Sequence, residues 1–267
     1  MKKILISMLF IVVACGEAKE PSNELQEGSN FIPFEGTVFV SNNILNSSDN
    51  SSFTSLKKIP NEERTMFDRR INDDSKDYAQ GSWINITPFL FTAFFSDGTE
   101  IEVQVNDEFE NNTNAESVAL SYLEVIGKLP KLFIKDVETV WIHRGLKPFG
   151  GGNNNLLIHT DWSAKHYEKQ GILEETFIHE ASHTSLDSLH ANSPGWLKAQ
   201  KSDCKFISSY AEDNPIREDI SESYLPYFAI RYRPERIRKS LKDSIENAIP
   251  NRIKYFDQQN FNMYPVK

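Results

Sequence analysis

The chain has 267 residues, of which 39% are hydrophobic and 25% charged, and its formal net charge is −9. This length and composition allow one or two folded domains and argue against a wholly disordered chain. The acidic excess argues against a nucleic-acid-binding protein, which usually carries a basic surface, and two cysteines can form at most one disulfide, so a disulfide-rich scaffold is excluded.

Residues 1–14 have the pattern of a secretory signal peptide. A positively charged start precedes the apolar run Ile4–Ala14, whose eleven residues are fewer than the roughly 20 that a membrane-spanning helix needs. The Val-Val-Ala-Cys sequence that ends at Cys15 resembles the bacterial lipobox, which implies that Cys15 is the lipid-modified first residue of the mature chain. The polar stretch 15–30 is typical of a flexible tether. We therefore expect a protein of the bacterial cell envelope, attached to the membrane by a lipid anchor on its periplasmic or extracellular face.

Residues 31–110 are expected to be rich in strands. Thr37–Val40 is a short run of β-branched and aromatic residues, as strands prefer. The clearest signal is a hairpin, because the runs Ile84–Phe95 and Glu100–Val105 flank the dipeptide Asp97-Gly98, which is typical of a tight turn between two strands.

Residues 111–267 show mainly the spacing of helices. Proline, glycine and apolar periodicity predict helices over 115–129, 171–189, 195–203, 215–232 and 234–248, and strands over 137–143 and 156–160. We therefore predict an α+β protein, in which a strand-rich N-terminal region, 31–110, is followed by a helical domain, 111–267, with a small sheet.

The helix expected over 171–189 contains the pattern His-Glu-x-x-His, formed by His179, Glu180 and His183. Positions i and i+4 lie on one face of a helix, so the two imidazoles can bind the same metal ion. Glu180 lies beside them, where it can take a proton from water instead of binding the metal. The alternative is a surface helix with two solvated histidines.

Two nearby residues fit poorly as a third ligand. His190 lies seven positions after His183, whereas the metzincin pattern places a histidine at position 189, and one position rotates a helical side chain by about 100°. Asp187 shares the face of His183 but lies a further turn along the helix, which suits a hydrogen bond to a histidine ring or a capping role.

A later helix, expected over 215–232, offers a better third ligand. Glu218 and Glu222 are four positions apart, one turn along this helix. One carboxylate of such a pair can bind the metal while the other orients a histidine or the first carboxylate. Glu218 is therefore the third candidate for the remaining ligand, with Glu222 in a supporting position.

The order His-Glu-x-x-His and then Glu-x-x-x-Glu resembles the gluzincin family of zinc metallopeptidases. The segment from Tyr210 to Glu222 is similar to the catalytic end of its anthrax-lethal-factor-like branch. This resemblance covers roughly residues 137–232 and implies a zincin-like domain with an active-site helix and a peptide or protein as substrate. It also implies one zinc ion held by His179, His183 and Glu218, with Glu180 as the general base and Tyr210 as a hydroxyl donor to the oxyanion of the transition state.

The resemblance further implies that the strand Asn155–His159 is an edge strand that pairs with extended substrate. The preceding Gly150–Gly152 and Asn153–Asn155 would then form a lip over the cleft. In the alternative, they only make the turn between two strands.

The sequence leaves more than one function open. A membrane-anchored zinc peptidase is the leading interpretation, and the rival is a non-catalytic envelope lipoprotein that binds zinc for folding or for gripping a partner. Glu180 favours the enzyme, because a structural zinc site has no use for a base and usually has four protein ligands. A zinc amidase acting on cell-wall peptides would use every residue named here. The sequence does not indicate an oligomeric state.

Overall fold

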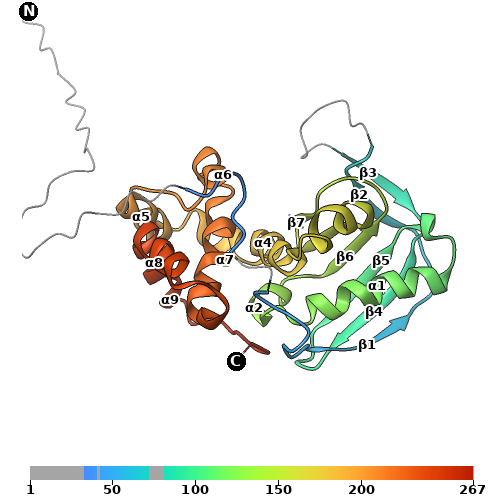
Figure 1. The fold of residues 1–267 in the computed structure, drawn as a ribbon. Coiled ribbons are helices and arrows are strands. Elements are labelled where there is room, and N and C mark those ends of the chain that lie inside the picture. Colours follow the sequence, from blue (N-terminus) through green and yellow to red (C-terminus); the bar gives the residue numbers. More distant parts are fainter. Residues whose placement is uncertain (1–32, 41–42, 72–80, 267) are drawn as a thin grey trace, which may run out of the picture. The chain divides into compact units, whose positions relative to one another are not determined.

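A six-stranded mixed sheet organises the fold in the computed structural model, which describes residues 33–40, 43–71 and 81–266 (Figure 1). The predicted signal peptide, Cys15 and the tether lie outside these described residues. The strand order is β1-β4-β5-β6-β8-β7. The strands are β1 (Phe53–Lys58), β4 (Phe89–Phe95), β5 (Glu100–Val105), β6 (Thr139–His143), β7 (Gly150–Gly152) and β8 (Asn155–His159). The α+β class predicted from the sequence is confirmed, and strands from both parts of the chain that the sequence distinguishes pair within this one sheet.

The sheet is antiparallel at its two ends and parallel in its middle. β4 pairs antiparallel with β1 and β5, whereas β5, β6 and β8 run parallel to one another. The predicted hairpin around Asp97-Gly98 is confirmed, with Phe89 opposite Val105. Gly98 has φ +86, a left-handed conformation that glycine adopts at little cost.

The prediction of one continuous strand arm over 84–95 is wrong. Residues up to Ile86 belong to β3 (Ser82–Ile86), which pairs with β2 (Arg64–Asp68) in a separate two-stranded sheet. The chain leaves this sheet at Pro88, which has no N–H for a strand ladder, and β4 begins at the next residue. The prediction of a strand at Thr37–Val40 is also wrong, because these residues form no ladder among the described residues.

Among the described residues, five helices match the predicted positions with shifted ends, and four further helices were not predicted. They are α1 (Asn112–Ile126), α2 (Lys131–Ile134), α3 (Thr160–Trp162), α4 (Leu173–Ser185), α5 (Pro194–Asp203), α6 (Ser209–Asp213), α7 (Asp219–Tyr232), α8 (Lys239–Ala248) and α9 (Pro250–Asp257). Helix α7 starts later than the predicted position 215, because a turn precedes it in which the N–H of Glu218 bonds to the carbonyl of Asn214. It continues through Pro226 to Tyr232.

Helices α1 and α4 cover one face of the sheet, and α4 also contacts α7 (Figure 1). Apolar residues on the inner faces of α1 and α4, such as Leu123 and Phe177, pack against Val103 and Val140 of the strands in one buried core. Removing this apolar surface from water is the main contribution that holds the helices on the sheet. The β2–β3 hairpin is tied to the sheet by an ion pair between Arg64 and Glu102 of β5, at 2.9 Å.

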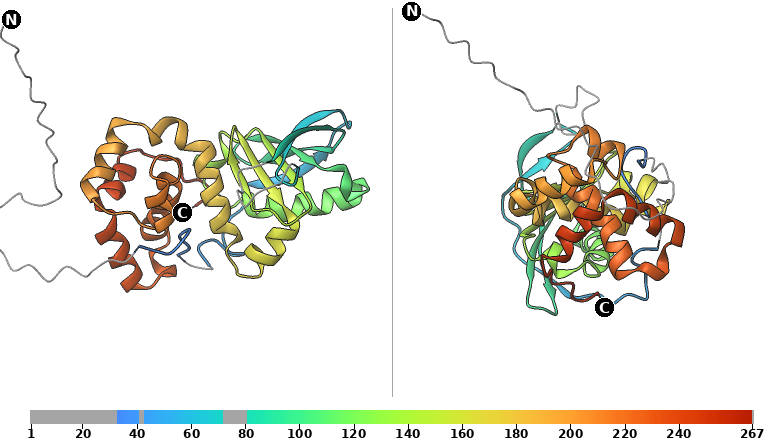
Figure 2. Two further views of the ribbon diagram at one scale, coloured as in Figure 1. Left: turned by 90° about the horizontal axis from the view of Figure 1, so that it is seen from above. Right: turned by 90° about the vertical axis from the view of Figure 1, so that its left-hand side faces the viewer.

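The C-terminal helices form a second group around an aromatic cluster. Trp196 of α5, Tyr224 of α7 and Phe256 of α9 are buried, and the rings of Tyr224 and Phe256 lie 5.1 Å apart edge to face. Figure 2 shows this group and the sheet on opposite sides, and Figure 1 shows α4 between them. Helix α4, which contains the histidine motif, is therefore held from both sides.

Among the described residues, no helix has both the length and the apolar character needed to cross a bilayer.

Candidate metal centre

Helix α4 presents His179 and His183 on the face that looks toward α7. Its opposite face, including Phe177, Ile178 and Ala181, is fully buried in the core. Two acidic residues in its first turn, Glu174 and Glu175, suit the positive end of the helix dipole. The burial pattern thus fixes the rotation of the helix, and the i, i+4 spacing places both imidazoles toward the same side.

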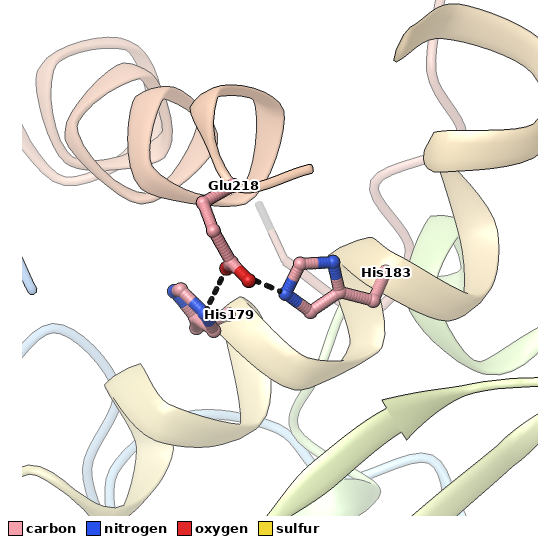
Figure 3. A group of neighbouring side chains, drawn as sticks. All are labelled: His179, His183 and Glu218. Carbon is pink, nitrogen blue, oxygen red and sulfur yellow. Dashed lines mark ion pairs between the residues drawn. The ribbon is translucent and has the colours of Figure 1, made fainter. Parts of the chain in front are cut away.

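Glu218 comes from the residue that immediately precedes α7, and its carboxylate lies between the two rings (Figure 3). Its Oε2 atom lies 3.1 Å from His183 Nε2 and 3.5 Å from His179 Nε2. The side chain of Glu218 is 4% exposed. The structure therefore brings together the two histidines and the acidic residue that the sequence suggested, from segments 35 positions apart.

These three side chains fit a metal ion. Their candidate ligand atoms all lie within 4.8 Å of one another, so the group could hold one cation. Ligands at 2.0–2.1 Å from a tetrahedral ion lie about 3.3 Å from each other, close to the observed nitrogen–oxygen distances. Although Glu218 Oε2 is near both rings, it is buried without a well-aligned hydrogen bond, as expected for an atom that faces a cation rather than a hydrogen.

The other ring nitrogens face acidic residues. His183 Nδ1 bonds to Asp187 Oδ2 at 2.8 Å, and His179 Nδ1 lies 3.2 Å from Glu222 Oε1. Both contacts are of the kind that fixes the orientation of a metal-binding imidazole and makes its free nitrogen more basic. The structure thus places Asp187 and Glu222 behind the two histidines, where the sequence suggested them.

Mutual electrostatics set the charges of the group. Burial lowers the pKa of both histidines, but nearby carboxylates have the larger effect. Glu218 and Glu222 raise the pKa of His179 well above its usual value. Asp187 and Glu218 raise the pKa of His183 to about 9. Burial raises the pKa of Glu218, yet the two histidines hold it well below its usual range. Glu218 is therefore ionised at neutral pH, the state in which a carboxylate binds metal.

The group lies in a cavity of about 610 Å³, which is also lined by Glu180 and Tyr210. Glu180 lines the same cavity as His183 and Tyr210, and its charge contributes to the raised pKa of both. Burial and the nearby Glu218 raise the pKa of Tyr210 above its ordinary value, so its phenol keeps the proton at neutral pH. Tyr210 is 36% exposed and lines the cavity, and its protonated hydroxyl can donate a hydrogen bond.

The short strand β7 lies directly against α4, and its Gly151 and Gly152 line the cavity. A Cβ atom at Gly151 would lie 1.8 Å from the backbone oxygen of Glu180, so only glycine allows this approach. The hydroxyl of Thr184 accepts the Gly152 N–H at 2.8 Å and donates to the Asn155 carbonyl at 3.0 Å. These contacts fix the strand beside Glu180.

The prediction that Asn155–His159 is an edge strand is wrong. These residues form β8, which pairs with β6 on one side and with β7 on the other. The edge is β7, in the glycine run that was predicted as either a lip or a turn. Three glycines lack β-propensity, so the local pattern did not indicate a strand.

Some residues at the site were not found from the sequence. Glu175 accepts a hydrogen bond from the N–H of Val40 at 2.7 Å, and Ser208 donates to Glu222 at 2.5 Å. Ser221 donates to the carbonyl of Glu218 at 2.9 Å, and its Oγ lies 3.4 Å from His183 Nε2. Glu175 and Ser208 stand outside the motifs, and Ser221 occupies a variable position of the Glu-x-x-x-Glu motif, so the sequence pattern assigned no role to any of them.

Comparisons with models of protein families, with curated proteins and with solved structures give no match.

Proposed function

We propose that this protein is a zinc-dependent peptidase of the bacterial cell envelope, attached to the membrane by a lipid on Cys15. One observation carries the proposal: two imidazoles and a buried carboxylate converge in a cavity that also contains Glu180 and Tyr210. Nitrogen and carboxylate ligands in this ratio are those of catalytic zinc sites in peptidases.

Zinc held by His179, His183 and Glu218 would supply a Lewis acid that polarises a carbonyl group and makes water a stronger nucleophile. Glu180 would take the proton from the attacking water and pass it to the leaving amine. The protonated phenol of Tyr210 would donate a hydrogen bond to the oxyanion, a contribution typically of about 3–4 kcal/mol. Asp187 and Glu222 would hold the rings in position throughout.

The composition of the group favours an enzyme over a purely structural zinc site. Among the described residues, three candidate ligands converge and no fourth histidine, cysteine or acidic residue joins them. A structural zinc site is normally closed by four protein ligands, whereas a catalytic site keeps one position open. The cavity next to the three ligands provides room for a substrate.

The test uses the purified full-length chain and its Glu180→Gln variant. Both are expected to bind about one zinc ion per chain by elemental analysis, but only the unmodified protein is expected to cleave a peptide library, with a loss in the variant of about 10²–10⁴-fold. The matched control is Glu174→Gln, which also replaces one glutamate of α4 by glutamine, but in the first turn of the helix. This variant should leave cleavage unchanged. Equal digestion by the wild type and Glu180→Gln would refute the proposal, and cleavage of cell-wall peptides alone would identify an amidase instead.

A further inference from the structure

Residues Phe34–Val40, here called the N-terminal strap, cross the candidate metal centre outside any sheet. The strap first runs beside α6, where the N–H of Phe34 bonds to the carbonyl of Ile207 and the N–H of Ser209 bonds to the carbonyl of Phe34. In Figure 1 it is the blue segment near α6 and α7. It then reaches α4, which carries the two histidines, and α7, which begins directly after Glu218.

Alternate residues of the strap face opposite ways. Val38 and Val40 are buried, whereas Thr37 and Phe39 line the cavity. The backbone N–H of Val38 donates to Glu222 Oε2 at 2.8 Å, and that of Val40 donates to Glu175 Oε2 at 2.7 Å. The strap therefore uses its backbone to bind one carboxylate of α7 and one of α4.

The contact with Glu222 determines which oxygen of this carboxylate faces the metal centre. Oε2 accepts two hydrogen bonds, from Val38 N–H and from Ser208 Oγ. Oε1 receives no well-aligned hydrogen bond and lies 3.2 Å from His179 Nδ1. Glu222 is 0% exposed, and a buried carboxylate without donors is strongly disfavoured, so its orientation depends on the donors that it finds.

We propose that the N-terminal strap is a positioning element of the metal centre. The N–H of Val38 holds Glu222 in the orientation that directs Oε1 at His179 and so aligns the imidazole for metal binding. This inference rests on the metal site of the proposed function, but it does not depend on peptide hydrolysis.

The experiment measures zinc affinity by competition with a chromophoric chelator, using the full-length chain. Val38→Pro removes the N–H donor and is expected to weaken zinc binding by about 10–100-fold, the usual effect of losing a group that orients a metal ligand. Val38→Ala keeps the N–H and shortens the same side chain, so it is the matched control and should bind zinc with nearly unchanged affinity.

A double-mutant cycle separates positioning from general damage. Glu222→Gln is expected to weaken zinc binding by a similar factor, and Val38→Pro should add little in that background because both changes disrupt the same contact. Additive losses, or wild-type affinity in Val38→Pro, would overturn the proposal. If Val38→Pro does not fold, replacing the backbone amide of Val38 by an ester takes its place in the cycle, since this change removes the same N–H donor and keeps the side chain.

The outcomes also distinguish this inference from the proposed function. A wild-type chain that binds no zinc would refute the metal site itself and the strap's role with it. Zinc binding that is unaffected by Val38→Pro would refute only the role of the strap. Coupled losses of affinity in a chain that cleaves no peptide would support the strap and refute the peptidase.

Discussion

Arg252 donates its Nε–H to Asp219 Oδ2 over 2.9 Å, and neither side chain is exposed. Arg252 belongs to α9 and Asp219 is the first residue of α7, immediately after Glu218. The same guanidinium bonds through Nη1 to Asp203 Oδ2 at 3.1 Å. The last helix of the chain thus fixes the start of α7, where the third candidate ligand lies.

We predict that Arg252→Met lowers the free energy of unfolding by about 3–5 kcal/mol, because it leaves two buried carboxylates without their cationic partner. Urea denaturation measures this change. Arg231→Met is the control, since Arg231 pairs with Asp257 at 2.9 Å but both side chains are partly exposed, with 34% and 40% of their surfaces accessible. An exposed pair of this kind contributes at most about 1 kcal/mol. Equal effects of the two variants would contradict the prediction.

The two acidic residues near His183 should differ in their effect on metal affinity. Glu218→Ala removes the proposed third ligand and should weaken zinc binding by more than about 100-fold. Asp187→Ala removes only the partner of His183 Nδ1 and should weaken it by about 10–100-fold. Competition titration with a chelator compares them, with apparent folding checked by circular dichroism. A larger loss in Asp187→Ala would overturn the assignment of Glu218.

A second pair of histidines should make folding stability depend on pH. His143 and His159, at the ends of β6 and β8, are 0% exposed and their rings stack 5.4 Å apart. Burial lowers the pKa of His143 from 6.5 to about 3 and that of His159 from 6.5 to about 4. Below pH 6.5, these two histidines therefore bind protons in the unfolded chain but remain neutral in the folded chain. Their contribution to stability is complete above pH 6.5 and is lost as the pH falls toward 4.

Each of these histidines should contribute a slope of about 1.4 kcal/mol per pH unit within this window. Between about pH 6 and about pH 5, the wild type should lose about 2 kcal/mol more stability than the variant His143→Asn/His159→Asn, whose amides do not titrate. Asparagine keeps an acceptor for the side chain of Asn106 and a donor for the carbonyl of Arg144. Denaturation curves at both pH values give the loss of unfolding free energy for the wild type and for the variant. Equal losses in the two proteins would refute the prediction.

The local pattern of the sequence was sufficient for the helix that bears the histidine motif and for the hairpin around Asp97-Gly98. Both depend on interactions within a few residues, namely the helical spacing of apolar residues and the conformational freedom of Gly98. The approach of Glu218 to His179 was inferred from the order of motifs and not from any local pattern. Only the packing of α7 on α4 produces it.

Two of the errors, at Thr37–Val40 and at Gly150–Gly152, have a common physical cause. Thr37–Val40 has the composition of a strand, but its N–H groups bond to carboxylates of two helices, a choice that depends on residues more than 130 positions away. Likewise, Gly150–Gly152 became an edge strand because Gly151 allows close contact with α4, not because of an intrinsic preference for strand. Long-range partners override local propensity at these positions.

The contact between Val38 and Glu222 spans 184 positions of the sequence. Glu218 and Glu222 follow His183 by 35 and 39 positions, so a growing chain carries both histidines before these two carboxylates have been made. A contact between residues so far apart in the sequence also forms slowly, because the chain between them must first be brought into a loop. The surroundings of the candidate metal centre can therefore be complete only after Glu222 has been synthesised and the N-terminal strap has reached it.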